Sequence, residues 1–409
     1  MVGAIVAAFL CGAPSVDAYS VLAHEAVIDV SWDSGVKPLL LQRFPNASPE
    51  DLLRARSFAY GGSVIQDLGY YPFGNHFFSN LLHYVRSGDF IETMMRSARD
   101  VDEYAFALGA LAHYVTDSIG HPVAVNRAVP KEYPKLRQKF GDEVTYAEAP
   151  SRHISVEFSF DIVQVAAGVY LPDAYRAFIG FRVAKPLLER AFRETYGLEM
   201  KQIFADEDRA IGTYRYAVSQ LLPTISQAAW RDKRDEIVRL LPTAQSSRIV
   251  FAYSRTDYEQ AYGVNYQRPG GVARILGFLY RLLPKIGPLK RLAFKAPTAE
   301  TERLFVTGFL ESRARYAEAL IADQEDRLDL QNTDLDTGKA AQRGEYSLAD
   351  ETYATLLERL VKIPSGNVPI ALCRNIRAFY AAQPKPSLFN KRERKRWERI
   401  ERALVVLPQ

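Results

Sequence analysis

Apolar residues recur every three or four positions along most of this chain, which is the spacing of one face of an α-helix. The pattern predicts helices over seven segments: Asp51–Leu68, Phe90–Ser118, His153–Val169, Pro186–Tyr196, Glu207–Leu222, Ala299–Ile321 and Ser347–Lys362. The alternation of apolar and polar residues that marks a β-strand is rare. The sequence therefore predicts an all-α protein built from many helices.

Residues that favour helix ends support some of these boundaries. Pro186 suits the first turn of its helix, and Gly197 suits the position just past the end. Ser347 and Asp350 resemble a capping box in front of the apolar residues that follow them.

The end of the segment around His113 is marked by Gly120 and Pro122, since neither residue favours the interior of a helix. We therefore expect His121 to lie just past this helix, where the chain turns. Residues Asp329–Glu345 are polar and contain glycine, and this composition predicts a long loop.

Composition places the chain among ordinary globular proteins. Its 409 residues are 48% hydrophobic and 24% charged, and they suffice for two or three domains. The net charge of +4 says little about partners. Every histidine precedes residue 154, whereas the part after about residue 200 is helical and richer in basic clusters. This shift predicts one domain over residues 19–200 and a helical C-terminal region over residues 201–409.

Residues 1–18 have the pattern of a secretory signal peptide. An apolar stretch of about ten residues ends in the small-residue site Val16-Asp17-Ala18. The stretch is too short to span a membrane. The basic residues that usually open such a signal are missing, so we expect the given start to lie inside the true signal and the protein to be exported, either periplasmic or secreted. A first buried helix is the alternative.

Cysteine cannot supply a zinc site in this chain. Only Cys11 and Cys373 are present, and cleavage after Ala18 would leave Cys373 alone. Any metal must therefore be held by histidine, aspartate and glutamate.

Two runs of residues pair histidine with a carboxylate at a spacing of four. The runs are His113, Asp117 and His121, and His153 with Glu157. Residues four apart share one face of a helix, and zinc binds imidazole nitrogen and carboxylate oxygen. One such pair is more often a surface or core hydrogen bond, whereas two runs together predict a metal site.

Further donors precede these runs, namely His24, Asp67, His76 and His83. A single catalytic zinc needs three protein ligands and an open position, so this number suffices for more than one ion. Asp117 lies between two histidines, where it could bridge two ions. We expect two or three zinc ions.

This set of residues resembles the zinc-dependent phospholipase C and P1-type nuclease superfamily, whose members are all-helical proteins with a trinuclear zinc site. The resemblance covers roughly residues 19–170 and rests on the order of the donors along the chain. It implies the metal ligands Tyr19, His24, Asp67, His83, His113, Asp117, His121, His153 and Glu157. It also implies an all-α, multi-helix catalytic domain, followed here by a helical C-terminal extension.

Two features depart from the pattern of that superfamily. The interval from Asp117 to His121 is two residues shorter, which could shift the geometry at the second metal. The mature chain of the family typically begins with Trp, whereas cleavage after Ala18 would leave Tyr19. Tyrosine can serve there because the backbone amine and carbonyl do the ligation. The interval of five residues from Tyr19 to His24 agrees with the nuclease branch.

His76 and His83 compete for one place in the ligand set. The sequence His76-Phe-Phe-Ser resembles a segment of the phospholipase branch, whereas His83 better fits the longer interval from Asp67. We favour His83 and keep His76 as the alternative ligand.

The resemblance implies hydrolysis of a phosphoric ester. Closely spaced zinc ions neutralise the phosphate and lower the pKa of a bridging water towards neutral. Asp67 then has two roles open to it, as a metal ligand or as a base towards the attacking water. A phospholipid headgroup bond is the favoured target. A single-strand nuclease or nucleotidase on the same metal core is one alternative, and a metal-holding protein without catalysis is another.

One basic segment of the C-terminal region suggests a second surface of interest. Residues Gly263–Thr298 contain several Lys and Arg residues between apolar ones and no acidic residue. This pattern suits an anionic membrane surface, and it would also suit a nucleic-acid backbone or an ordinary packed helix. The candidates for membrane contact are Lys285, Lys290, Arg291 and Lys295.

Overall fold

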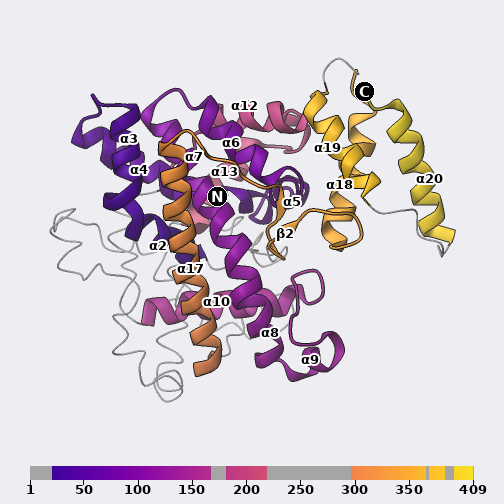
Figure 1. Ribbon diagram of the computed structural model, residues 1–409, viewed down its shortest axis with the longest axis horizontal. Coiled ribbons are helices and arrows are strands. Elements are labelled where there is room, and N and C mark those ends of the chain that lie inside the picture. The colour runs from indigo at the N-terminus through magenta and orange to yellow at the C-terminus, as the bar shows by residue number, and fades with distance from the viewer. Residues whose placement is uncertain (1–20, 167–180, 219–295, 365–367, 383–390, 409) are drawn as a thin grey trace.

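The computed structural model of the protein describes residues 21–166, 181–218, 296–364, 368–382 and 391–408, and these segments are mostly helical (Figure 1). The prediction of an all-α fold is therefore confirmed. Among the described residues, no helix combines the length and the apolar character that crossing a membrane requires.

The described residues 21–166 form nine α-helices and three short helical turns. The α-helices are α2 (Val21–Ser31), α3 (Lys37–Arg43), α4 (Pro49–Gly62), α5 (His76–Tyr84), α6 (Ser87–Ser97), α7 (Val101–Gly120), α8 (Asn126–Glu132), α9 (Pro134–Phe140) and α10 (Pro150–Ala166). The short turns are the π-helical η1 (Trp32–Val36), the 3₁₀-helical η2 (Ile65–Tyr70) and the π-helical η3 (His121–Val125).

The described elements that follow include one pair of very short strands. In chain order, these described elements are α12 (Lys185–Tyr196), the 3₁₀ turn η5 (Met200–Gln202), α13 (Glu207–Tyr216), α17 (Ala299–Gln324), β1 (Thr333–Asp334), β2 (Lys339–Ala340), α18 (Ser347–Leu360), α19 (Ile370–Ala381) and α20 (Lys391–Val406). Strands β1 and β2 pair antiparallel, with Thr333 opposite Ala340.

Helix α7 lies at the centre of the core, with α4 and α17 packed against it (Figure 1). The α4–α7 contact is very close because glycines face it. A Cβ atom on Gly62 would lie 2.0 Å from the carbonyl oxygen of Phe106, and one on Gly109 would lie 2.0 Å from that of Ala59. On the other side, the hydroxyl of Tyr316 in α17 donates to the carbonyl of Leu108 at 2.9 Å. Side chains from distant parts of the chain thus fix α7 in place.

Two of the expected helices are each divided in the structure. The segment Phe90–Ser118 forms α6 and α7, which are separated because Asp100 caps the second helix by accepting a hydrogen bond from the backbone of Glu103. The segment Asp51–Leu68 ends as an α-helix at Gly62 and continues as the 3₁₀ turn η2. The ends of the segments predicted to reach Val169 and Leu222 lie outside the described residues.

His121 lies just past α7, as expected, because this α-helix ends at Gly120, but the expectation that the chain turns there is wrong. Helix α7 passes through the π-helical turn η3 into α8, and the N–H groups of His121 and Asn126 donate to the carbonyls of Asp117 and His121. Pro122 has no N–H for the α-helical bond to Ser118, so a wider π turn accommodates it without ending the helical path. His121 therefore stays on the helical surface that follows Asp117.

The structure confirms Pro186 in the first turn of α12 and Gly197 just past its end, with a left-handed φ of 66°. The capping box at Ser347 is wrong. Tyr346 occupies the position before α18, and the carboxylate of Asp350 accepts from the backbone N–H of Gly344 instead. Asp350 thus caps the loop in front of the helix.

The connection between α17 and α18, residues 325–346, is the long loop that the sequence predicted, apart from the short strands β1 and β2 within it. Its inner residues Thr333, Asp334, Leu335 and Asp336 are buried. The backbone N–H of Leu335 donates to the carbonyl of His83 at 3.1 Å. This connection therefore packs directly against a helix that carries one of the expected metal ligands.

Candidate metal centre

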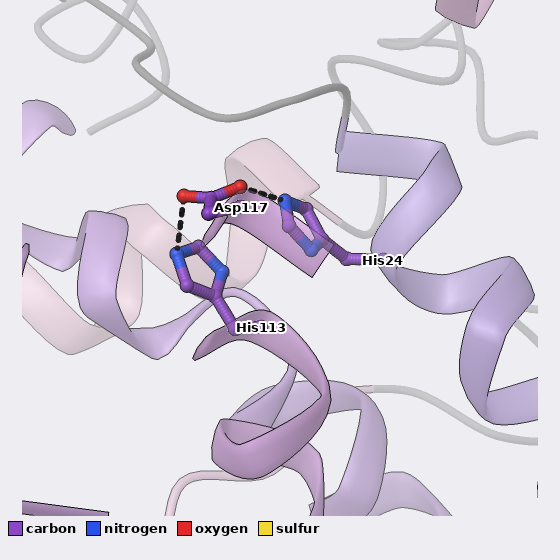
Figure 2. A group of neighbouring side chains, drawn as sticks. All are labelled: His24, His113 and Asp117. Carbon is purple, nitrogen blue, oxygen red and sulfur yellow. Dashed lines mark ion pairs between the residues drawn. The ribbon is translucent and has the colours of Figure 1, made fainter. Parts of the chain in front are cut away.

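Asp117 is the centre of a buried cluster of histidines. Its Oδ1 lies 3.2 Å from Nε2 of His24, and its Oδ2 lies 3.0 Å from Nε2 of His113. Figure 2 shows the two rings facing the two oxygens of this carboxylate. Nε2 of His83 and Nε2 of His121 approach Oδ2 at 3.4 and 3.6 Å. Four histidines from four elements thus converge on one carboxylate.

The donors form three groups in which the possible ligand atoms lie within 4.8 Å of one another. The groups are His24 with His113 and Asp117, Asp67 with His83 and His113, and His121 with His153 and Glu157. All these residues are buried. The distances between ligand atoms on one tetrahedral zinc are roughly 3–3.5 Å for bond lengths of about 2 Å, which is close to the separations around Asp117.

The local structure of each helix explains how these side chains meet. Asp117 follows His113 by one turn of α7, so both face the core together. His153 and Glu157 repeat this arrangement on α10, with His153 Nδ1 2.7 Å from Glu157 Oε1. His121, on η3, joins the two pairs because its Nδ1 lies 3.8 Å from Glu157 Oε1. The shorter interval from Asp117 to His121 therefore still brings His121 to both carboxylates.

Backbone carbonyls fix the orientation of two of the rings. Nδ1 of His83 lies 2.8 Å from the carbonyl oxygen of Ser79, and Nδ1 of His113 lies 3.0 Å from that of Ser63. A carbonyl oxygen can only accept, so each Nδ1 carries a hydrogen, and in the neutral ring each Nε2 is left with its lone pair. Both lone pairs point into the cluster, as a metal requires.

Several buried polar atoms of the cluster have no hydrogen-bond partner among the described residues. They include Oδ2 of Asp67, Nδ1 of His24, and Nδ1 of His121. Leaving such atoms without a partner inside a protein is costly. The donor set of imidazoles and carboxylates is the one that zinc accepts. The residues present therefore fit zinc.

The cluster controls the charge of its own members. Burial would raise the pKa of Asp117, but the surrounding His113, His121 and His24 hold it well below its usual value. Burial, together with neighbouring imidazoles, lowers the pKa of His24 and holds that of His153 well below its usual value. Asp117 is thus ionised and these two histidines are neutral at neutral pH, the forms in which they can bind a metal.

His83 and His121 behave differently because carboxylates surround them. Burial would lower the pKa of His83, but contacts with Asp117 and Asp67 raise it well above its usual value. Burial would also lower the pKa of His121, but the nearby Asp117 carboxylate outweighs burial and raises it. A raised pKa favours the protonated form of each ring, and a metal ion that binds there would have to displace that proton.

The structure separates the two histidines that competed for one place. His83 lies in a ligand group with Asp67 and His113, whereas His76 is exposed and packs its ring edge against Tyr70. Their geometry favours His83. Tyr19 lies outside the described residues, and its role as a ligand stays a prediction. So do the ligand roles of the other residues, which the structure brings together but does not test.

Two polar residues beside the cluster were not foreseen from the sequence. Asn126 on α8 lies 2.8 Å from Nε2 of His153, and nothing in the sequence around it signals this role. Asp161 accepts from the backbone N–H of Leu22 at the start of α2. Asp161 follows Glu157 by four residues, so the spacing that found the other pairs could have found it too.

Comparison with known proteins gives one match. Residues 30–206 match the family model described as zinc dependent phospholipase C. Neither curated proteins nor solved structures gave a match to the chain. The matched range contains all but one of the described candidate ligands, since His24 precedes it.

Proposed function

Residues 30–206 match the zinc-dependent phospholipase C family, and from this premise we propose that the protein hydrolyses a phosphodiester of a phospholipid headgroup. The observation that supports the proposal most is the set of three buried ligand groups, two of which share His113, with Asp117 close to the donors of all three. Two or three zinc ions held there would neutralise the phosphate and activate a water for attack.

The residues divide this work between them. His24, His113 and Asp117 form one ligand group, Asp67 and His83 share His113 in a second, and His121, His153 and Glu157 form the third. Asp117 connects the second and third groups, because its Oδ2 lies 3.4 Å from Nε2 of His83 and 3.6 Å from Nε2 of His121. Asp117 is therefore the residue best placed to bridge two ions.

Asp67 is our candidate for proton transfer. Its Oδ2 is buried without a hydrogen-bond partner among the described residues, and its Oδ1 lies 3.4 Å from Nε2 of His83. A carboxylate in this position can ligate a metal with one oxygen and accept a proton from the attacking water with the other. The two roles open to Asp67 are thus compatible with each other.

One experiment tests the substrate and the metal together. The purified protein, with its zinc content measured, is offered phospholipid vesicles and single-stranded DNA in parallel. We expect headgroup release from lipid that stops on chelation and returns with zinc. Cleavage of DNA alone would favour the nuclease, and full zinc content with no turnover of either substrate would favour a metal-holding protein without catalysis.

Export is a further part of the proposal. His24 already lies in the cluster, so a mature chain beginning at Tyr19 would start one short segment before α2. N-terminal sequencing of exported protein should give Tyr19 first. An extra residue placed before Tyr19 should lower zinc content and turnover, because it displaces the terminal amine.

Binding to an anionic membrane surface is proposed from the sequence alone, since Lys285, Lys290, Arg291 and Lys295 lie outside the described residues. Each basic residue near such a surface contributes about 1 kcal/mol, and salt weakens the effect. Changing all four to Ser should reduce binding to anionic vesicles while hydrolysis of a soluble short-chain ester survives. Equal loss on both substrates would mean that the segment is packed structure.

A further inference from the structure

The connection between α17 and α18, residues 325–346, lies outside the range that the family model matches, yet it is bonded to the helices of the metal centre. The hydroxyl of Tyr114 in α7 donates to the carbonyl of Gln331 at 2.6 Å, and that of Ser87 in α6 donates to the carbonyl of Thr333 at 2.5 Å. With the bond from Leu335 to the carbonyl of His83, the connection touches α5, α6 and α7.

One of its carbonyls reaches the centre through a single side chain. Nδ2 of Asn126 donates to the backbone carbonyl of Asp336 at 2.7 Å. Oδ1 of the same amide lies 2.8 Å from Nε2 of His153. Asn126 and His153 are both buried, with 2% and 0% of their surface exposed. Water is thus largely excluded from this pair of contacts.

The contact of Asn126 with the carbonyl of Asp336 determines which amide atom faces His153. A carbonyl oxygen can only accept a hydrogen bond, so the amide atom facing Asp336 must be the nitrogen. The atom facing His153 is then the oxygen, which also can only accept. Nε2 of His153 must therefore carry the hydrogen, and in the neutral ring the lone pair falls on Nδ1.

Nδ1 is the nitrogen that faces Glu157, with 2.7 Å between it and Oε1. Two lone pairs at this separation repel each other unless a proton or a cation lies close to both. His83 and His113 are oriented the opposite way, since carbonyls hold their Nδ1–H and leave Nε2 for the cluster. His153 thus differs from them in the nitrogen that it presents.

We propose that Asn126, held by the carbonyl of Asp336, is a positioning residue that selects Nδ1 of His153 as the metal-binding atom of the group with His121 and Glu157. The connection between α17 and α18 is thereby a functional part of the metal centre. This inference rests on the zinc-binding part of the proposed function and does not depend on the substrate.

The carbonyl of Asp336 is itself held firmly. The carboxylate of Asp336 accepts hydrogen bonds from the hydroxyl of Tyr84 at 2.9 Å and from the hydroxyl of Tyr346. Only 3% of the surface of Asp336 is exposed. Its backbone N–H donates to Asp334 at 2.9 Å. Buried hydrogen bonds therefore hold Asp336, and the contact with Glu157 holds His153, at the two ends of the series Asp336–Asn126–His153.

The experiment uses nitrogen NMR of the full chain, labelled with ¹⁵N-histidine and loaded with zinc. Six histidines give few enough signals to separate, and His153→Gln assigns the signal of interest by its loss. The spectrum distinguishes a metal-bound Nδ1 with a protonated Nε2 from the reverse. We expect the first pattern for His153 in the unmodified protein.

Two variants test the part played by Asn126. Asn126→Leu removes the acceptor, and zinc affinity at this group should fall about 10–100-fold, as measured by competition with a chelator. Asn126→Asp keeps an acceptor towards His153 and should retain the Nδ1 pattern. Asn375→Leu is the matched control, because Asn375 accepts from the hydroxyl of Tyr353 away from the cluster; its zinc affinity should not change.

The outcomes separate this inference from the proposed function. Zinc on Nε2 of His153 in the unmodified protein overturns the inference, as does an unchanged pattern with unchanged affinity in Asn126→Leu. Should Asn126→Leu fail to fold, the spectra of the unmodified protein and of Asn126→Asp still decide. Zinc bound as expected without lipid hydrolysis would refute the proposed function and leave the inference standing.

Discussion

At the scale of single residues, Asp117 is the position on which the cluster depends most. Four histidine nitrogens lie within 3.6 Å of its two oxygens, and the side chain has no exposure to solvent. An ionised carboxylate is needed here because, without its negative charge, the surrounding imidazole rings would place only neutral or positive groups against one another.

We predict that Asp117→Asn abolishes most zinc binding and turnover. The amide keeps the size of the side chain but loses the negative charge and one acceptor. Loss of a residue that supports a ligand typically costs about 10–100-fold in affinity or activity, and loss of a bridging carboxylate should exceed that. Metal analysis and lipid hydrolysis measure both effects. Asp142→Asn, at an exposed ion pair with Arg137, is the control and should leave both unchanged.

Asp334 is a second buried carboxyl group, and its ionised form is unfavourable in the folded protein. Burial, followed by the charge of Asp336, raises its pKa to about 7. The folded protein therefore holds a proton on Asp334 that the unfolded chain releases near pH 4. Because the folded state binds more protons between about pH 4 and 7, this group makes the free energy of unfolding fall as the pH rises through that range.

We predict that Asp334→Asn is more stable than the unmodified protein at pH 7 to 8 and little different at pH 4. The amide can still accept from the backbone of Asp336 and can donate to the hydroxyl of Thr337, which now bonds to Asp334 at 2.9 Å. The gain at high pH should be on the order of a few kcal/mol at most. Thermal unfolding with chelator present, at both pH values, measures it; an equal difference at both would contradict the charge argument.

The sequence predicted the donor residues but not the groups that orient the histidine rings. Spacing alone identified His113 with Asp117 and His153 with Glu157, since four residues on a helix bring two side chains together. The partners of the rings are backbone carbonyls of Ser63 and Ser79 and the amide of Asn126. Backbone carbonyls occur at every residue, so no pattern of side chains reveals which of them will bind a histidine.

At the scale of elements, the contact between α4 and α7 sets the position of the centre. Gly62 and Gly109 let the two backbones approach until carbonyls fill the space of the missing side chains. Helix α7 carries His113 and Asp117, and α4 leads through Ser63 into the turn that holds Asp67. The separation of these helices is thus also the separation of their ligands.

We predict that Gly109→Ala destabilises the protein and weakens zinc binding. The new Cβ would lie 2.0 Å from the carbonyl of Ala59, so one helix must move. Overpacking of this kind costs about 1–3 kcal/mol, and more where backbone rather than side chain must shift. Gly212→Ala, on α13, is the control because nothing lies within 4 Å of its Cβ. Alanine there should be neutral or stabilise slightly. Unfolding curves and zinc content compare the two variants.

Periodicity predicted the helices themselves better than their interruptions. The apolar pattern continues across residues 98–100 and into η2, so it could not show where α6 ends or where α4 tightens. These breaks arise from the cap at Asp100 and from the backbone geometry after Gly62. At Pro122 the predicted end of the α-helix was right, but the chain continues as a π turn where the sequence predicted a change of direction.

At the scale of the whole molecule, the C-terminal part supports the matched domain. Helix α17 packs along α7, with Phe309 and Tyr316 fully buried. Thr301 at its start donates to Glu132 of α8 at 2.8 Å. The boundary expected at residue 200 stays a prediction, but these contacts cross it.

We predict that a fragment ending at residue 218 does not fold cooperatively or hold zinc, because α7 would lose α17 and the centre would lose the connection at residues 325–346. Circular dichroism during heating and metal analysis test this. Deletion of residues 383–409 is the control, since α20 contacts α18 away from the candidate ligands (Figure 1). A soluble, zinc-bound fragment with a sharp unfolding transition would contradict the prediction.

The bond between Tyr84 and Asp336 joins residues 252 positions apart in the sequence. Contacts of such separation form slowly, since a long loop must close before they contribute. All six histidines leave the ribosome long before Asp336 is made. The chain must therefore remain incompletely assembled around its metal ligands until residues 325–346 have been synthesised, and zinc loading of the finished centre has to follow the synthesis of that connection.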